Sequence, residues 1–161
     1  MASLFPGDSL YDADFYAWTQ DQAARLRNAA AARVNIDLDW NNLAEEVESM
    51  GGSERSEIYN RLIELLFHLA KLAWSPDLPP RADWTVSVLN QRDGIAYAIG
   101  KSPSLKRHPQ EIFDDCWAKA RKRAAVALTV PVSRFPLTCP WDLTAQVLDD
   151  DWLPPAPTDN T

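Results

Sequence analysis

The pattern of hydrophobic and polar positions along this chain predicts helices almost throughout. In residues 58–74, apolar side chains recur three and four positions apart on two neighbouring faces. A helix with this much apolar surface packs against several neighbours, so we expect the segment to lie at the centre of the core. Its narrow polar stripe, which we expect to face solvent, consists of Glu57, Arg61, Glu64, His68 and Lys71.

Two helices are predicted before this central one. The first runs from a cap at Asp12 to about residue 33, because an aspartate there can accept a hydrogen bond from a free backbone amide. The second opens at residues 37–40 and ends at the glycine pair 51–52, since glycine tolerates the left-handed conformation of a helix end. Ser53 would then cap the central helix. One continuous helix, kinked at the glycine pair, is the alternative.

Two more helices and a strap are predicted after it. Asp83 caps a fourth helix, and a fifth extends from Pro109, a favourable first helical residue, to about residue 129. Residues 131–153 contain several prolines but are too apolar for a solvated linker, so we expect them to wrap over the bundle, with a short helix after Asp142. The predicted fold is all-α: a compact bundle of about five main helices with a proline-punctuated C-terminal strap.

Length and composition narrow the class of protein. A chain of 161 residues fits a single domain, which we expect to span residues 1–153 before a disordered tail at 154–161. The two cysteines are too few for a disulfide framework and do not form a Cys-x-x-Cys zinc motif. No export signal and no segment long enough for a membrane helix is visible, so we expect a cytoplasmic protein without a membrane partner.

Charge is distributed unevenly along the chain, whose formal net charge is −7. Residues 1–60 hold eleven acids against four bases, whereas residues 101–134 hold eight bases against three acids. We interpret these as complementary surfaces that face each other within the fold or across a homodimer. The pI of about 4.7 argues against a nucleic-acid partner, because nucleic-acid-binding modules are typically basic.

Five blocks of sequence, in the same order, are similar to one known family. They are Tyr-Asp-Ala-Asp-Phe-Tyr-Ala-Trp (11–18), Asp-Trp-Asn-Asn-Leu-Ala-Glu-Glu-Val-Glu-Ser-Met-Gly (39–51), His-Leu-Ala-Lys-Leu (68–72), Ser-Pro-Ser-Leu (102–105) and Cys-Pro-Trp (139–141). Together, over residues 9–153, they resemble domain-of-unknown-function family 29 (DUF29). The resemblance implies an all-helical fold and no assigned activity.

Glu45, Glu48, Glu64 and His68 are the candidate metal ligands. Imidazole nitrogens and carboxylate oxygens bind divalent metals, and Glu64 lies one helical turn before His68. Against a metal, the Glu-x-x-His pairs of carboxylate-bridged dimetal bundles are absent. The competing interpretation is an ordinary polar stripe with pairing between positions four apart. No other cofactor is predicted.

Acid–base catalysis has three candidates: Glu45, Glu48 and His68. Crowded carboxylates can raise a pKa into a catalytic range. A solvated acidic face is the simpler interpretation, and a buried network with Arg61 or His68 that specifies the packing is another. Neither Cys116 nor Cys139 has a histidine nearby in sequence, and no nucleophile-elbow, phosphate-loop or dinucleotide motif occurs.

The function expected from the sequence is a small protein-interaction or adaptor module rather than an enzyme. Its acidic N-terminal half would bind a basic protein or a second copy of the chain. A metal-dependent hydrolase or nuclease using Glu45, Glu48, Glu64 and His68 is the alternative. The seven tryptophans lie on apolar stripes or at helix ends, which indicates core packing.

Overall fold

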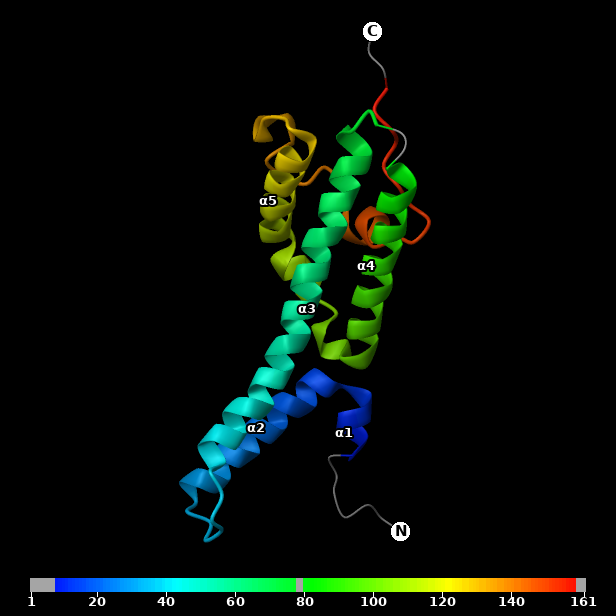
Figure 1. Ribbon diagram of the computed structural model, residues 1–161. Coiled ribbons are helices and arrows are strands. Elements are labelled where there is room, and N and C mark those ends of the chain that lie inside the picture. The colour runs from blue at the N-terminus through cyan, green and yellow to red at the C-terminus, as the bar shows by residue number, and fades with distance from the viewer. Residues whose placement is uncertain (1–7, 78–79, 159–161) are drawn as a thin grey trace. The chain divides into compact units, whose positions relative to one another are not determined.

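The computed structural model describes residues 8–77 and 80–158. Over these residues the chain forms five α-helices and no strand, which confirms the all-α prediction. None of the helices in this part of the chain is long and apolar enough to cross a bilayer. The helices are α1 (Asp8–Ala13), α2 (Phe15–Ala31), α3 (Trp40–Trp74), α4 (Arg81–Lys101) and α5 (His108–Leu128) (Figure 1). Three short helical turns follow, at Pro103–Leu105, Val132–Arg134 and Leu143–Val147.

Contacts between residues group the chain into two units. Unit 1 comprises the residues up to Glu57 together with Tyr97–Arg107, and unit 2 comprises Ile58–Ala96 together with the residues from His108 onward. Two of the three boundaries, after Glu57 and after Ala96, fall inside long helices, so α3 and α4 each contribute to both units. The third lies just before α5. The expectation of one domain stays a prediction.

In unit 1, Asp14 rather than the predicted Asp12 caps the second helix. Asp14 has extended backbone, and its Oδ1 accepts a hydrogen bond from the Ala17 amide at 2.8 Å. Asp12 lies inside α1 instead. Asp14 also accepts bonds from the Ser104 amide, at 2.6 Å, and from the Ser104 hydroxyl, at 2.8 Å. These long-range contacts reinforce the cap, and no local pattern reveals them.

The prediction that a helix ends at Gly51 and Gly52 is wrong, because α3 runs straight through both residues. Neither glycine has a positive φ, so neither forms a helix end. Figure 1 shows α2 alongside the first half of α3, and here Gly51 is buried: a methyl group on it would collide with the Thr19 hydroxyl. Gly51 therefore permits close helix packing. Ser53, predicted as a cap, donates to the Ser49 carbonyl at 3.1 Å.

The second half of α3 forms the core of unit 2, as the apolar pattern of residues 58–74 predicts. Its inward side chains are at most 1% exposed: Ile58, Leu62, Ile63, Leu65, Leu66, Leu69, Ala70 and Leu72. Val88 of α4 and Trp117 of α5 are buried to the same extent. The fourth helix begins at Arg81, so Asp83 lies in its first turn and is not its cap.

The C-terminal strap is held to unit 2 by one buried arginine that the sequence analysis did not single out. Arg92 of α4 is 3% exposed. Its guanidinium donates to the carbonyls of Val147 at 2.9 Å, Gln146 at 3.2 Å and Trp152 at 2.9 Å. The short helix predicted after Asp142 is confirmed at Leu143–Val147, and the Asp142 side chain caps it by accepting hydrogen bonds from the Thr144 and Ala145 amides. The strap is thus fixed mainly through its backbone.

Aromatic side chains provide the apolar part of the strap contact. Trp141 of the strap lies 5.6 Å from both Trp74 and Trp117, measured between ring centroids. The strap is not buried throughout, since Leu137 is 82% exposed, contrary to the prediction that its apolar residues cover the bundle. Of the tail expected to be disordered, Pro154 is buried, and residues 159–161 lie outside the described residues.

Candidate functional site

His68, predicted on a solvent-facing stripe, is largely buried in unit 2. Its side chain is 16% exposed. Burial, with a smaller contribution from the charge of Lys71, lowers the pKa of His68 to about 4. The imidazole is therefore neutral at pH 7, and its buried Nδ1 has no hydrogen-bond partner among the described residues. The prediction for the stripe is wrong here because packed side chains cover this part of α3.

Lys71 is the second buried member of that stripe. Its ammonium lies 4.3 Å from the ring centroid of Phe67 and 4.7 Å from that of Trp84. The aromatic faces stabilise the charge in place of water. Burial lowers the pKa of Lys71 from its ordinary value. Among the described residues, neither His68 nor Lys71 has a hydrogen bond to a carboxylate.

Glu64 is engaged with α5 more closely than with His68. Its Oε1 accepts a hydrogen bond from Arg123 at 2.5 Å. Its Oε2 lies 3.8 Å from the His68 Nε2, too far for a good hydrogen bond. The predicted pairing between positions four apart is therefore loose.

Glu45 and Glu48, the other two predicted ligands, are exposed in unit 1. The Glu48 carboxylate accepts a hydrogen bond from Arg27 at 2.6 Å, and this bond lowers the pKa of Glu48. Glu48 belongs to unit 1 and Glu64 to unit 2, although both lie on α3. No group of three or more potential metal ligands occurs in the described residues.

In the part of the chain that the structure describes, nothing supports a metal-dependent hydrolase or nuclease, and the four ligands stay a prediction. The predicted network of Glu45 or Glu48 with Arg61 or His68 required two separate helices, whereas these residues share the single helix α3.

Both cysteines are protonated thiols at neutral pH. Burial raises the pKa of Cys116 to about 12 and that of Cys139 to about 11. A nucleophilic cysteine needs a lowered pKa. The Cys116 Sγ lies 3.7 Å from the Tyr59 carbonyl, a contact typical of a packed structural thiol.

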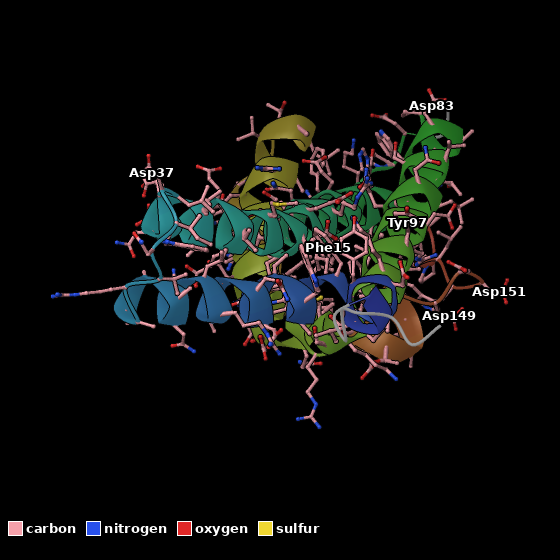
Figure 2. All side chains as sticks on the ribbon, turned by 90° about the horizontal axis from the view of Figure 1, so that it is seen from below. Phe15, Asp37, Asp83, Tyr97, Asp149 and Asp151 are labelled. Carbon is pink, nitrogen blue, oxygen red and sulfur yellow. The ribbon has the colours of Figure 1, made fainter. Side chains whose placement is uncertain are left out.

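In unit 1, an exposed connection between α2 and α3 combines apolar and acidic side chains. We call residues 34–39 the acidic segment. Val34, Ile36 and Leu38 are 43%, 56% and 50% exposed. Asp37 and Asp39 alternate with them, and Figure 2 shows Asp37 projecting from this connection. Exposed apolar side chains bordered by charged ones are typical of surfaces that bind other molecules.

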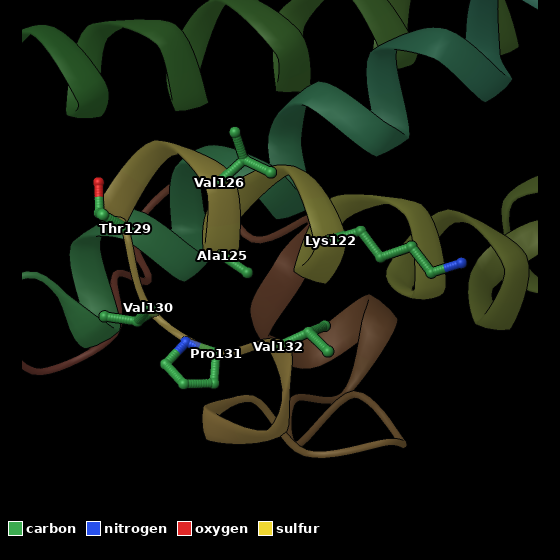
Figure 3. A pocket seen from close by; sticks show the side chains of 7 residues that line it. All are labelled: Lys122, Ala125, Val126, Thr129, Val130, Pro131 and Val132. Atoms are coloured by element: carbon green, nitrogen blue, oxygen red, sulfur yellow. The ribbon is translucent and has the colours of Figure 1, made fainter.

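In unit 2, the end of α5 and the chain after it line a shallow, open groove of about 600 Å³ (Figure 3). It is lined by Lys122, Ala125, Val126 and residues 129–132, and we call it the basic groove. Val126 is 81% exposed although it is apolar and lies on a helix. The wall is fixed by Arg121, which donates to the Val132 carbonyl at 3.3 Å, and by the Val130 amide, which donates to the Ala125 carbonyl at 3.0 Å.

Four bases of α5 lie close together in sequence, Lys119, Arg121, Lys122 and Arg123, and two of them are paired with carboxylates. Lys119 lies 3.3 Å from the Asp115 carboxylate and also contacts the Tyr59 hydroxyl. Arg123 pairs with Glu64, and Arg121 supports the groove wall. Lys122 has no hydrogen-bond or ion-pair partner among the residues that the structure describes. The groove was not predicted from the sequence, although Val126, an apolar residue on the outer face of α5, was a local sign of it.

The family model described as Domain of unknown function DUF29 matches residues 10–153. Among solved structures, the chain is similar to an alpha-helical protein of unknown function from Rhodospirillum rubrum. The two are 27% identical, the match covers 88% of this chain and 90% of that one, and the TM-score is 0.73. No curated protein matches the chain.

Proposed function

The chain belongs to the DUF29 family, which has no assigned activity, and we propose that it is a cytoplasmic protein-interaction module whose acidic N-terminal half binds a basic protein surface. The observation that carries the proposal is the acidic segment. Three large apolar side chains at alternate positions are each at least 43% exposed there, next to unneutralised carboxylates.

The surroundings of the acidic segment favour a basic partner. Residues 34–48 contain five acids and no base. Only Glu48 of these is neutralised by an ion pair among the described residues, with Arg27. A surface of this kind attracts lysine- and arginine-rich surfaces and accelerates the encounter with them at low salt. The apolar side chains then supply contact area that charge alone does not.

The proposal is tested by capturing proteins from a cell lysate on the immobilised chain at low and at high salt, with two variants. Asp37→Lys reverses one charge of the acidic segment, and Asp93→Lys makes the same change at an exposed position of α4. Asp39 is left intact because it caps α3 by accepting from the Asn42 amide. We expect a basic protein that wild type and Asp93→Lys retain at low salt and release at high salt, and that Asp37→Lys does not retain. Equal retention by all three proteins would refute the proposal.

A further inference from the structure

The basic groove has the size and lining of a site for a short apolar segment. Three valines, an alanine and a proline form most of its surface, and Figure 3 shows Lys122, the charged residue of the lining, extending from α5. Val126 and Val132 are 81% and 40% exposed, so much of this apolar surface meets water. Covering it with apolar side chains would be favourable by about 25 cal/mol per Å².

The electrostatic field around the groove selects an acidic occupant. Among the bases of α5 beside the groove, Lys119 and Arg123 are paired with carboxylates, whereas Arg121 and Lys122 are not paired with one in the described residues. Lys122 lies on the rim and, within the described residues, has no carboxylate to pair with. An occupant with carboxylates beside its apolar side chains would satisfy both the lining and the rim.

The acidic segment of the same chain has this chemistry. Its backbone forms three successive hydrogen bonds between residues two apart, from Ile36 to Val34 at 2.8 Å, Leu38 to Ile36 at 2.9 Å and Trp40 to Leu38 at 3.0 Å. Such successive tight turns keep alternate side chains on opposite sides of the segment. Val34, Ile36 and Leu38 therefore form an apolar ridge, and Asp37 and Asp39 form an acidic edge.

We infer that the basic groove binds the acidic segment of a second copy of the chain. The inference rests on the proposed function, for which it names both the partner and the partner's surface. The apolar ridge enters the groove, and the Asp37 carboxylate pairs with the Lys122 ammonium. In a reciprocal dimer, in which the segment of each copy binds the groove of the other, the two contacts are identical by symmetry. Because the contact area is small, the dimer is weak and forms in a concentration-dependent way.

The test is sedimentation equilibrium over a range of protein concentrations, with Lys122→Glu and Asp37→Lys as the main variants. Both side chains are exposed, so neither change disturbs the core. Wild type is expected to dimerise more tightly at low salt than at high salt. Each single variant should raise the dissociation constant about tenfold, because it replaces an attraction by a repulsion. Lys106→Glu and Asp93→Lys, equal charge reversals at other exposed positions, should leave it unchanged.

Mixing the two single variants provides the decisive measurement. In a mixed dimer, each groove faces a segment of opposite charge, so an equimolar mixture should dimerise as wild type does. A mixture that stays monomeric, or a wild-type protein that is monomeric at every concentration, would overturn the inference. Self-association that neither Lys122→Glu nor Asp37→Lys weakens would overturn it too. These outcomes are distinct from failure of the proposed function, because retention of a different basic protein depends on Asp37 but not on Lys122.

Discussion

His68 makes the stability of the protein depend on pH, because its imidazole is neutral in the folded protein and harder to protonate there than in the unfolded chain. The unfolded chain takes up a proton at this histidine below about pH 6.5, whereas burial lowers the pKa of His68 to about 4 in the folded protein. Between these values the unfolded state binds the extra proton. The stability that the neutral, buried His68 contributes is therefore fully present above about pH 6.5 and is lost as the pH falls toward about 4.

We expect the free energy of unfolding to fall between neutral pH and about pH 5, and to fall less in His68→Leu, which has no proton to bind. Urea unfolding of both proteins at the two pH values measures this difference. Both share the same carboxylates, so the comparison isolates the histidine. An equal fall in wild type and variant would show that the imidazole is not buried in the neutral form.

Arg33 and Thr129 have left-handed backbone, with φ of 49° and 54°. Each follows a helix in a Schellman motif: the Val34 amide bonds to the Ala29 carbonyl at 3.5 Å, and the Val130 amide bonds to the Ala125 carbonyl at 3.0 Å. Glycine occupies this position without steric cost, and a β-branched residue such as threonine is the most strained there.

Replacing either residue by glycine is expected to stabilise the protein by about 0.5–1 kcal/mol, the relief of strain less the larger entropy of the unfolded chain. Thermal or urea unfolding measures the change. Lys106→Gly is the control, since Lys106 has φ of −55° and gains nothing from glycine. Destabilisation by Thr129→Gly equal to that of the control would contradict this account.

At the scale of elements, the contact between α2 and α3 depends on Gly51, and its neighbour Gly52 offers a matched comparison. A methyl group at Gly51 would meet the buried Thr19 hydroxyl, whereas at Gly52 it would meet nothing within 4 Å. We expect Gly51→Ala to destabilise by about 1–3 kcal/mol through overpacking. Gly52→Ala should stabilise by about 0.5–1 kcal/mol, because alanine is the better helix former. The midpoints of urea unfolding show whether each variant is more or less stable than wild type. Identical effects of the two substitutions would show that the packing of α2 on α3 does not depend on Gly51.

The contact between α4 and the strap depends on Arg92. We expect Arg92→Ala to destabilise the protein by about 3 kcal/mol or more, because it removes charge-assisted hydrogen bonds and leaves buried carbonyls without donors. Limited proteolysis should then cut the chain within residues 131–158 faster than it cuts wild type. Arg107→Ala, at an exposed position, should change neither measurement. Unchanged protection in Arg92→Ala would show that the aromatic contacts suffice.

Helix-scale features were predictable where the cause is local. The apolar spacing of residues 58–74 predicts both the central helix and its buried faces, and Asp142 predicts the short helix that follows it. The predicted end of a helix at the glycine pair failed because Gly51 responds to a side chain of α2, which is far away in sequence. Arg92 could not be recognised, because its partners are backbone carbonyls more than fifty residues later, and a carbonyl leaves no signal in the sequence.

For the whole molecule, the two units share α3 and α4, so we expect them to unfold together. Circular dichroism and tryptophan fluorescence, followed during urea unfolding, should give coincident single transitions. Gly51→Ala in unit 1 and Arg92→Ala in unit 2 should each move that one transition. Two separate transitions, of which each variant moves one, would refute the expectation of a single domain.

By itself, the sequence determined the all-helical class, most helix positions and the separation of acidic from basic charge, because these depend on side-chain periodicity and on composition. The tertiary structure decided which of those side chains are buried and which are exposed to solvent. It buried His68 and Lys71 on a stripe that seemed exposed, and it left the acidic segment and the basic groove open to solvent. The physical reason is that burial and pairing depend on residues distant in sequence, and local periodicity carries no information about them.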